Sequence, residues 1–430
     1  MTVPFQGWSS LLAIHFAPVL FLLVPLYLVF KGPLFLLYLQ VLAVGLASIP
    51  LYLLAREKLS GKYPALVVAT TYLLFRPLLN GLLYDFHPEM FFPLFILSGH
   101  YCLTVRKNVL LFFVFILLAL FIKEDFAIYV FFYCLWLLRS TEPGQRKIGL
   151  MAAIGSALYA MSVFIFFIPH FRVQIHASSA YEFISRWQDY GSTVKQIIGQ
   201  CLAHPRRFLY DLKLLPNLAG LANYFLPLML IPLLDPIVLL ILPPLFIGWL
   251  SRIPLMGTFG LYYGAALIPF LFLALLQALT RLKQQKSSDP TREIVKWAWI
   301  LNLLLIFSLF NFKWNLLVPA NYRNIHNFPA VRKCLKMIPE HASLAAQSAL
   351  IPHIPRRKSI FMLPATGEAE YILLHLQLNP WPLSTAQLRE LDGRLQRSAK
   401  YRCLFSSGGL QLYEMKGAGA TPGSSGENSK

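Results

Sequence analysis

The stretch Tyr84-Asp85-Phe86-His87-Pro88-Glu89-Met90 lies between two long apolar runs and places two carboxylates and an imidazole close together. A second polar group, Lys123-Glu124-Asp125, follows two further apolar runs. Most of the remaining chain between residues 11 and 315 is hydrocarbon, aromatic or loop. Several of the runs are as long as a helix that crosses a bilayer. The pattern therefore predicts a membrane scaffold that presents a few acids on one side.

The composition separates this chain from soluble proteins. Of its 430 residues, 57% are hydrophobic and 13% are charged, and the mean hydropathy is +0.58. A soluble domain is about 45–50% apolar and about 25% charged. The 30 prolines, many of them inside or beside the apolar runs, suit helices whose breaks line a cavity. The fold class we expect is mainly α, a polytopic transmembrane helical bundle.

The formal net charge of +19 would favour nucleic-acid binding in a soluble protein. Here the basic residues lie in short loops, as the positive-inside rule requires of a membrane protein. The chain also shows no surface module of interleaved basic and aromatic residues. We therefore expect membrane lipid, and no nucleic acid, among its partners.

Apolar runs divide residues 1–319 and predict about ten or eleven spans. Breaks between them coincide with charged or proline-rich segments. The runs occupy residues 11–30, 33–55, 64–83, 90–105, 108–122, 126–138, 149–169, 214–232, 236–250, 262–280 and 297–318.

Four basic segments orient the bundle: residues 56–62, 106–107, 139–147 and 281–296. If all four are cytoplasmic, an even number of spans must separate each basic segment from the next, and the apolar runs satisfy this condition from residue 33 onward. We call this agreement charge parity. Both acidic groups, the polar residues 170–212 and everything after residue 319 then lie outside. We expect a multi-pass protein whose C-terminal region is extracytoplasmic.

Residues 325–416 lack long apolar runs, and their alternating strand and helix patterns predict a small α/β domain. Helices are expected at residues 328–338 and 384–400, and strands at 342–347, 359–363, 371–377, 401–406 and 411–416. Residues 417–430 have the composition of a disordered tail. The five cysteines lack CxxC spacing, and Cys334 and Cys403 in this region leave a disulfide open.

Several segments together resemble a known family. The chain resembles the domain-of-unknown-function family 2079, bacterial predicted membrane proteins, from about residue 10 to residue 376. That family in turn resembles the GT-C superfamily of polytopic glycosyltransferases. The segments that carry the resemblance are HFAPVLFLLVPLYLVF, IPLYLLAREKL, YDFHPEMFFPLFIL, KEDFA, AHPRRFL, PLLDPIVLLILPPLFIGWLS and YYGAALIPFLF.

The resemblance implies a function and a location. GT-C enzymes transfer sugars from polyprenyl-phosphate donors and carry acids in their first extracytoplasmic loops. It therefore implies a bacterial inner-membrane enzyme of cell-envelope glycoconjugates, with a divalent cation such as Mg²⁺ or Mn²⁺ as a possible cofactor. It also implies that residues 11–30 form a juxtamembrane or re-entrant helix on the outside. The alternative for that segment is an ordinary first span.

Two departures from the family pattern favour a second function class. Members of the family begin with one more span and an acid-bearing loop, whereas this chain begins close to the HFAP segment. The usual catalytic acid of GT-C enzymes then has no counterpart. Tyr262 also stands where the family has a histidine beside Tyr263. The alternative is a non-catalytic or truncated membrane protein that binds lipid or an envelope partner.

The DFHPE group supplies the first candidate site residues. By resemblance, Asp85 occupies the position of a second GT-C acid, which would bind a divalent metal or the donor phosphate. Its alternative is a solvated loop acid or a helix N-cap. His87 is a candidate general base or ligand, or else a histidine that fixes the turn at Pro88. Glu89 is a candidate substrate-binding acid, or else a carboxylate favoured by the dipole of the next helix.

The KED group follows an apolar run of 15 residues, 108–122, and a short span ending in acids indicates a cavity. Glu124 and Asp125 are therefore candidate catalytic residues. Lys123 is a candidate phosphate-binding residue, with an interfacial ion pair as its alternative. We also expect Asp85 and Glu124 to line one water-filled cavity open to the outside, together with His87 and Arg76. The remaining candidate substrate-binding residues are His15, Arg76 and Tyr263.

Overall fold

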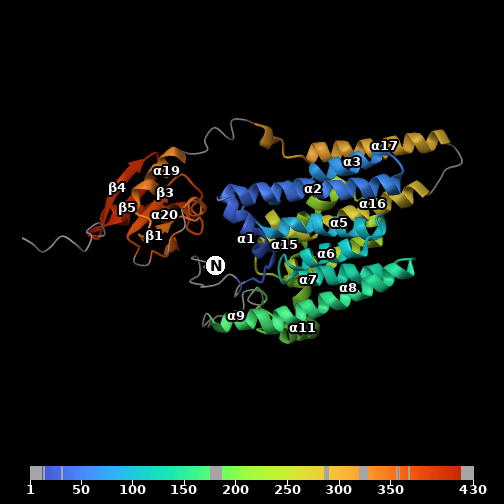
Figure 1. Ribbon diagram of the computed structural model, residues 1–430, viewed down its shortest axis with the longest axis horizontal. Coiled ribbons are helices and arrows are strands. Elements are labelled where there is room, and N and C mark those ends of the chain that lie inside the picture. Colours follow the sequence, from blue (N-terminus) through green and yellow to red (C-terminus); the bar gives the residue numbers. More distant parts are fainter. Residues whose placement is uncertain are drawn as a thin grey trace, which may run out of the picture. The chain divides into compact units, whose positions relative to one another are not determined.

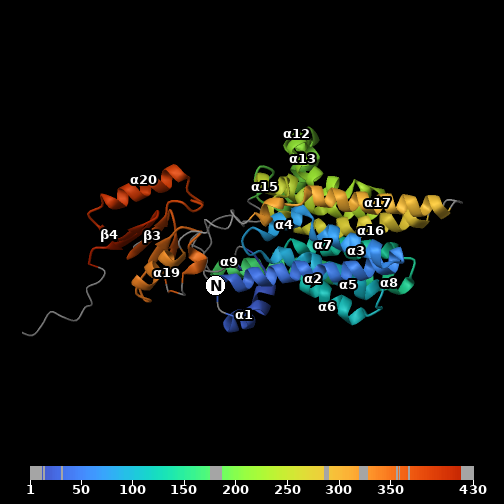
Figure 2. The same ribbon diagram turned by 90° about the horizontal axis from the view of Figure 1, so that it is seen from above.

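The computed structural model describes residues 12, 15–30, 32–174, 186–284, 290–318, 328–354, 357, 359–366 and 369–417. The chain divides into two compact units. One unit is Leu12–Trp314, and the other consists of the described residues from Asn315 onward. The first unit is helical and the second contains a β-sheet (Figures 1 and 2). The mainly helical fold class is therefore confirmed.

The helical unit contains α-helices interrupted by short 3₁₀ segments and one π-helical segment. The α-helices are α1 (Val19–Val29), α2 (Pro33–Leu59), α3 (Lys62–Leu73), α4 (Arg76–Leu82), α5 (Phe92–Thr104), α6 (Val109–Leu120), α7 (Phe126–Trp136), α8 (Pro143–Ser162), α9 (Ile168–Gln174), α11 (Val194–Ala203), α12 (Pro205–Asp211), α13 (Leu214–Phe225), α14 (Leu242–Trp249), α15 (Pro254–Gly257), α16 (Ile268–Gln284) and α17 (Pro290–Asn311). The other segments are η2 (Pro88–Phe91), η3 (Leu137–Arg139), η4 (Val163–Phe167), η5 (Leu226–Leu228), η6 (Ile231–Leu234), η7 (Pro236–Ile241) and η8 (Leu261–Ala266), and η9 (Trp314–Leu317) begins at the last residue of this unit.

Helix α16 lies at the centre of this unit. Almost every residue from Ile268 to Thr280 is buried, as expected of a helix that is apolar on all sides and enclosed by others. The Phe272 ring packs edge-on against Tyr72 of α3 at 5.2 Å and Phe75 at 5.3 Å between ring centroids. The long helices α2, α8, α16 and α17 lie with their axes roughly parallel, and α17 runs back along α16 in the opposite chain direction (Figures 1 and 2). The unit is therefore a bundle built around α16.

The outer surface of the bundle is rich in exposed apolar side chains. On α8 and η4, Ile154, Leu158, Met161 and Ile165 are each more than half exposed. Continuous apolar surface of this extent is unfavourable in water and marks contact with lipid or another protein. Within the described residues, three helices are long and apolar enough to cross a bilayer, at Leu34–Leu59, Pro143–Val173 and Glu293–Asn311. These features are those of a membrane protein.

Bent and short helices account for much of the remaining apolar sequence. Two pairs, Lys62–Leu73 with Arg76–Leu82 and Pro254–Ala266 with Ile268–Gln284, bend by 45° and 75°. Counting each pair as one span gives up to five spans among the described residues. Four further apolar helices are shorter than a span, so the expected ten or eleven spans remain a prediction.

Residues 226–241 differ from the two spans expected at 214–232 and 236–250. Helix α13 ends at Phe225, and η5, η6 and η7 carry the chain to α14. Prolines at 227, 232 and 236 remove helical hydrogen-bond donors, and Met229 and Leu230 adopt positive φ angles of 54° and 57°. Such irregular backbone is tolerated at membrane depth only where protein or a water-filled cavity surrounds it. The prolines therefore replace two regular spans with a partly buried break.

Helix α1 is short and almost entirely exposed. Its 11 residues reach about 16 Å at 1.5 Å per residue, roughly half of a bilayer core. Of its residues only Val19 is buried, while Leu28 and Val29 are 62% and 72% exposed. The length agrees better with the juxtamembrane or re-entrant interpretation of residues 11–30 than with an ordinary span.

The second unit contains a five-stranded sheet with one helix on each face. Strands β2, β1 and β3 are parallel, and β5 and β4 continue the sheet antiparallel, in the order β2-β1-β3-β5-β4. Its elements are α19 (Phe328–Met337), β1 (Leu344–Ala346), η10 (Ile351–His353), β2 (Ile360–Met362), β3 (Tyr371–His375), α20 (Thr385–Gln396), β4 (Tyr401–Ser407) and β5 (Leu410–Met415). Each helix and strand predicted between residues 328 and 416 is confirmed to within four residues, whereas its extracytoplasmic location remains a prediction.

Alternation along the strands divides the domain core in two. Leu344 and Leu373 pack on the face that α19 covers, and Ile372 and Leu374 pack on the face that α20 covers. Both Cys334 and Cys403 are free thiols, so the disulfide left open by the sequence is absent. The physical reason is placement, because Cys334 is buried in the α19 core cluster whereas Cys403 is exposed on β4.

Residues 325–416 expressed alone should fold, because both core clusters lie within the segment. We expect a circular dichroism spectrum of mixed helix and strand and a cooperative thermal transition. Leu373→Ala should lower the free energy of unfolding by about 2–5 kcal/mol, since the Leu373 side chain is fully buried.

The matched control is Met337→Ala on α19, where the side chain is 40% exposed. Its effect on the free energy of unfolding should stay within about 0.5 kcal/mol. A disordered spectrum for the isolated segment would contradict an autonomous domain.

Candidate functional site

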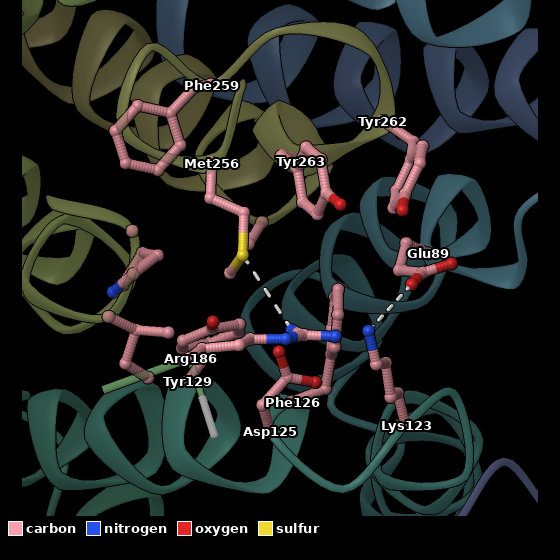
Figure 3. A pocket seen from close by; sticks show the side chains of 14 residues that line it. Glu89, Lys123, Asp125, Phe126, Tyr129, Arg186, Met256, Phe259, Tyr262 and Tyr263 are labelled. Atoms are coloured by element: carbon pink, nitrogen blue, oxygen red, sulfur yellow. Dashed lines mark hydrogen bonds and ion pairs between the residues drawn. The ribbon is translucent and has the colours of Figure 1, made fainter. Parts of the chain in front are cut away.

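The two acidic loops meet at one small pocket in the helical unit. Segment η2 contributes Glu89, and the turn between α6 and α7 contributes Lys123 and Asp125. The free volume is about 30 Å³, enough for a water molecule or two. Figure 3 shows the charged side chains converging from opposite sides. The lining residues are Glu89, Lys123, Asp125, Phe126, Tyr129, Arg186, Pro244, Ile247, Gly248, Met256, Phe259, Tyr262, Tyr263 and Ala266.

A buried ion pair joins the loops. The Lys123 Nζ atom donates to Glu89 Oε1 at 3.2 Å, and each side chain is only 8% exposed. His87 Nδ1 lies 3.6 Å from the other oxygen of Glu89. Burial alone would raise the pKa of Glu89, but the nearby Lys123 ammonium and His87 outweigh it and hold the pKa below its usual range. Glu89 is therefore ionised and paired.

Local sequence explains why Glu89 turns inward. Pro88 begins η2, and the extended backbone at His87 precedes it. The backbone N–H of His87 donates to Gln40 Oε1 of α2 at 2.7 Å. The His87 ring stacks on Tyr262 with 3.4 Å between ring centroids. These contacts fix the loop against α2 and η8.

Asp125 is the pocket acid that forms no ion pair with a lysine or arginine among the described residues, although one oxygen of Glu89 also lacks a hydrogen-bond partner. It is 5% exposed, and its Oδ1 atom has no hydrogen-bond partner among the described residues. Burial is the main cause that raises the pKa of Asp125 above its usual value, although Lys123 opposes it. Charge on Glu124 and Glu89 raises this pKa further. A buried carboxyl of raised pKa beside cations is suited to accept a proton.

Glu124 serves a different purpose from its neighbour. Its side chain is fully buried, and Oε1 lies 2.8 Å from His15 Nδ1 while Oε2 accepts the Phe16 N–H at 2.9 Å. Burial tends to raise the pKa of Glu124, but His15 outweighs it and lowers the pKa. Glu124 therefore anchors the segment before α1 and is not among the lining residues.

Arg186 completes the pocket and was not predicted from the sequence. It is 8% exposed, its Nη1 lies 3.7 Å from Met256 Sδ, and its Nη2 lies 3.4 Å from His15 Nε2. Its Nε has no hydrogen-bond partner within the described part of the chain. In the sequence, Arg186 is one of four arginines in the polar segment 170–212 and resembles any solvated loop residue. Only its packing against the His15 segment distinguishes it.

Of the other predicted site residues, the structure places one in the lining of this pocket and the rest outside it. Tyr263 lines it, whereas Asp85 is exposed and is not among the lining residues. Arg76 is exposed and lines a different cavity of about 150 Å³ with Asn80 and Thr258. The expectation that Asp85 and Glu124 line one cavity with Arg76 is therefore not met by either pocket. The reason is that His87 and Pro88 redirect the chain, so Glu89 rather than Asp85 faces inward.

A larger apolar cavity adjoins the polar pocket. Its volume is about 500 Å³, and both cavities share Ile247. Trp187, the residue after Arg186, lines it and donates from Nε1 to the Ile247 carbonyl at 3.2 Å. The other lining residues are Ile128, Ala160, Met161, Phe164, Ile165, Ile197, Phe246 and Leu250. Together the two cavities offer a charged pocket beside an apolar one.

The sequence of the chain matches one known protein family. The family model described as a predicted membrane protein, DUF2079, matches residues 2–412, nearly the whole sequence. The chain belongs to the DUF2079 family. No curated protein matches it.

The expected divalent cation fits this DUF2079 protein poorly at the positions predicted for it. No cluster of three or more histidine, cysteine or acidic residues suited to a metal occurs among the described residues. Mg²⁺ and Mn²⁺ prefer several oxygen ligands, whereas Lys123 and Arg186 already place positive charge beside the pocket carboxylates. Asp85 is an exposed single carboxylate. We therefore derive no chemical step through a metal.

The ion pair between the loops should matter for the stability of this DUF2079 protein. Lys123→Met should lower the free energy of unfolding by about 3–5 kcal/mol, because it leaves the Glu89 charge buried and unpaired. The double variant Glu89→Gln/Lys123→Met should recover most of this loss, since no buried charge remains. Chemical denaturation of the purified protein in detergent measures both effects.

Lys107→Met is the matched control. Lys107 pairs with Glu142 at 2.7 Å, but both side chains are more than half exposed, so its loss should cost no more than about 1 kcal/mol. A double variant that loses the sum of both single effects would contradict a coupled pair.

Proposed function

We propose that this chain transfers a sugar from a polyprenyl-phosphate donor at the pocket formed by Glu89, Lys123, Asp125 and Arg186. The observation that carries the proposal is the unpartnered Asp125 oxygen beside two buried cations. A general base needs an accessible lone pair, and a phosphate leaving group needs positive charge. The GT-C resemblance of the family supports the same reaction class by analogy only.

The proposed step is an inverting displacement at the anomeric carbon of the sugar. The acceptor hydroxyl oxygen forms the new bond to this carbon, and its proton passes to the Asp125 carboxylate. The bond between the anomeric carbon and the phosphate oxygen breaks, and the electron pair leaves with the polyprenyl phosphate. Lys123 and Arg186 stabilise the added negative charge on that phosphate.

The two cavities indicate which part of such a donor would bind in each. The apolar cavity of about 500 Å³ suits part of a polyprenyl chain, and the polar pocket suits the phosphate. About 30 Å³ is too small for a sugar phosphate, so donor binding requires the pocket to widen. Arg186 is the side chain best placed to move, because its contacts to Met256 and His15 are long.

The proposal places this chemistry outside the bacterial inner membrane. The support is charge parity, which assigns both acidic loops and the C-terminal domain to the face opposite the basic loops. The second candidate function, a non-catalytic protein that binds lipid or an envelope partner, is favoured by the small volume of the polar pocket. It would use the same apolar cavity without transfer.

Asp125→Asn should abolish sugar transfer by the purified protein and leave it folded. In the folded state the pKa of Asp125 lies above the usual 3.8, so its ionisation destabilises the fold as pH rises through and beyond that value. The neutral amide removes this effect, and the midpoint of thermal unfolding at pH 7 should stay equal or rise. Radiolabelled polyprenyl-phosphate sugar and membrane extract as acceptor source provide the transfer assay.

Asp85→Asn is the comparison variant, because the resemblance assigns a role to Asp85 although it lies outside the pocket lining. Transfer lost in Asp85→Asn but kept in Asp125→Asn would contradict our assignment of the base. A wild-type protein that retains polyprenyl phosphate but transfers no sugar would support the non-catalytic alternative.

The proposed topology predicts where the C-terminus lies. Alkaline phosphatase, which is active only in the periplasm, should be active when fused after Lys416, because charge parity places residues after 319 outside. A fusion after Lys147, in a basic segment expected inside, is the control and should be inactive. The reverse pattern would place both acidic loops on the cytoplasmic face and contradict the use of an extracytoplasmic donor.

A further inference from the structure

A second polar cavity lies between helices α2, α5, α8 and α16, with the end of α7, η3 and η7 completing its wall. Its volume is about 280 Å³, far more than the roughly 10–15 Å³ that one water requires. None of its lining residues belongs to the pocket around Asp125. The lining residues are Lys58, His100, Thr104, Trp136, Leu137, Arg139, Ser140, Gln145, Asp235, Pro236, Ile237, Gln277 and Arg281.

The charge of this cavity is positive. Lys58, Arg139 and Arg281 contribute three cations, and Asp235 contributes one carboxylate, a formal balance of +2 (3 − 1). Asp235 is buried and forms an ion pair with Arg281 at 3.1 Å between Nε and Oδ2. Its other oxygen accepts the Ile237 N–H at 2.9 Å. The single carboxylate is therefore already engaged.

The other two cations are available to a ligand. Lys58 Nζ donates to Gln277 Oε1 at 3.2 Å, and the Arg139 guanidinium lies 4.8 Å from the Trp136 ring centroid. Neither side chain forms an ion pair with any residue that the structure describes. The Asp235 carboxylate also attracts the Lys58 ammonium, but one carboxylate cannot offset three cations, so the cavity keeps an excess of positive charge that an anion would balance.

We propose that this cavity binds a phosphate ester. Arginine presents a planar fork of donors that matches phosphate oxygens, and lysine adds a point charge. Thr104, Gln145 and Gln277 add hydrogen-bonding groups around the same space. A phosphate ester carries the negative charge that offsets the local excess.

The position of the cavity favours a lipid headgroup as the source of the phosphate. Lys58, Arg139 and Arg281 come from three of the basic segments that charge parity assigns to the cytoplasmic face. Basic pockets between membrane helices on that face bind anionic lipid headgroups. Trp136 lines the cavity, and neighbouring Leu138 is exposed, so apolar surface continues from it. The inference does not depend on sugar transfer at Asp125.

The test measures binding of phosphatidylglycerol to the purified full-length protein by native mass spectrometry. Saturable retention of one lipid is expected against a background of phosphatidylcholine. Arg139→Gln should weaken this binding at least about threefold, because one charge contact to phosphate is lost. Arg139 is exposed and makes no described ion pair, so the variant should fold normally. Asp235→Asn should strengthen binding, because it frees Arg281 and can still accept from the Ile237 N–H.

Arg106→Gln is the matched control, an exposed arginine on the same expected face that does not line the cavity. It should leave binding unchanged. Equal weakening by Arg106→Gln and Arg139→Gln would indicate a diffuse basic surface and overturn the site, as would no saturable binding. Glycerol 3-phosphate in solution identifies the source: displacement at similar concentration supports a soluble ester, and failure to displace supports a lipid headgroup.

Discussion

The buried charge cluster between the two acidic loops is the interaction on which the helical unit depends. Lys123 and Glu89 come from segments 34 residues apart and pair where little water is available. Removing two charges from water costs more than most single contacts supply, so the pair persists only because each partner compensates the other. Glu124 extends the cluster to His15 and so ties the start of α1 to the same point. These few charges thus link η2, the turn between α6 and α7, and the segment before α1.

The sequence predicted the C-terminal domain better than the membrane unit, and the reason is periodicity. Strands β3 and β5 alternate or bury apolar side chains in short runs bounded by turns, which a sequence displays directly. In the membrane unit the apolar runs are longer than the helices, because prolines such as Pro232 and Pro236 break them. A hydropathy pattern detects apolar residues, but it does not show where the backbone hydrogen bonding of a helix is interrupted.

The same limit applies to the candidate site. The loop acids were predicted as a group, and Glu89, Lys123 and Asp125 do meet. Sequence alone cannot tell Glu124 from Asp125, because adjacent residues in a turn face different ways and the choice depends on His15, far away in the chain. Arg186 carried no signal for the same reason. The charged residues of the Asp125 pocket nevertheless come from segments that charge parity assigns to the outside. The charged residues of the second polar cavity, around Lys58 and Arg139, come from segments that it assigns to the cytoplasmic face.

Helix α1 has a consequence for the lipid around the protein. If residues 11–30 enter the bilayer as a re-entrant helix, an apolar helix of about 16 Å would fill the hydrocarbon of one leaflet and leave the other leaflet without a matching element. Lipids of the first leaflet would then splay around it, and the bilayer would adjust by local thinning at a modest cost for each ångström of mismatch. Because His15 and Phe16 hold the start of this helix at Glu124, that disturbance would be centred beside the charged pocket. Under that interpretation the chain would couple the order of its surrounding lipid to the place where its acids are buried.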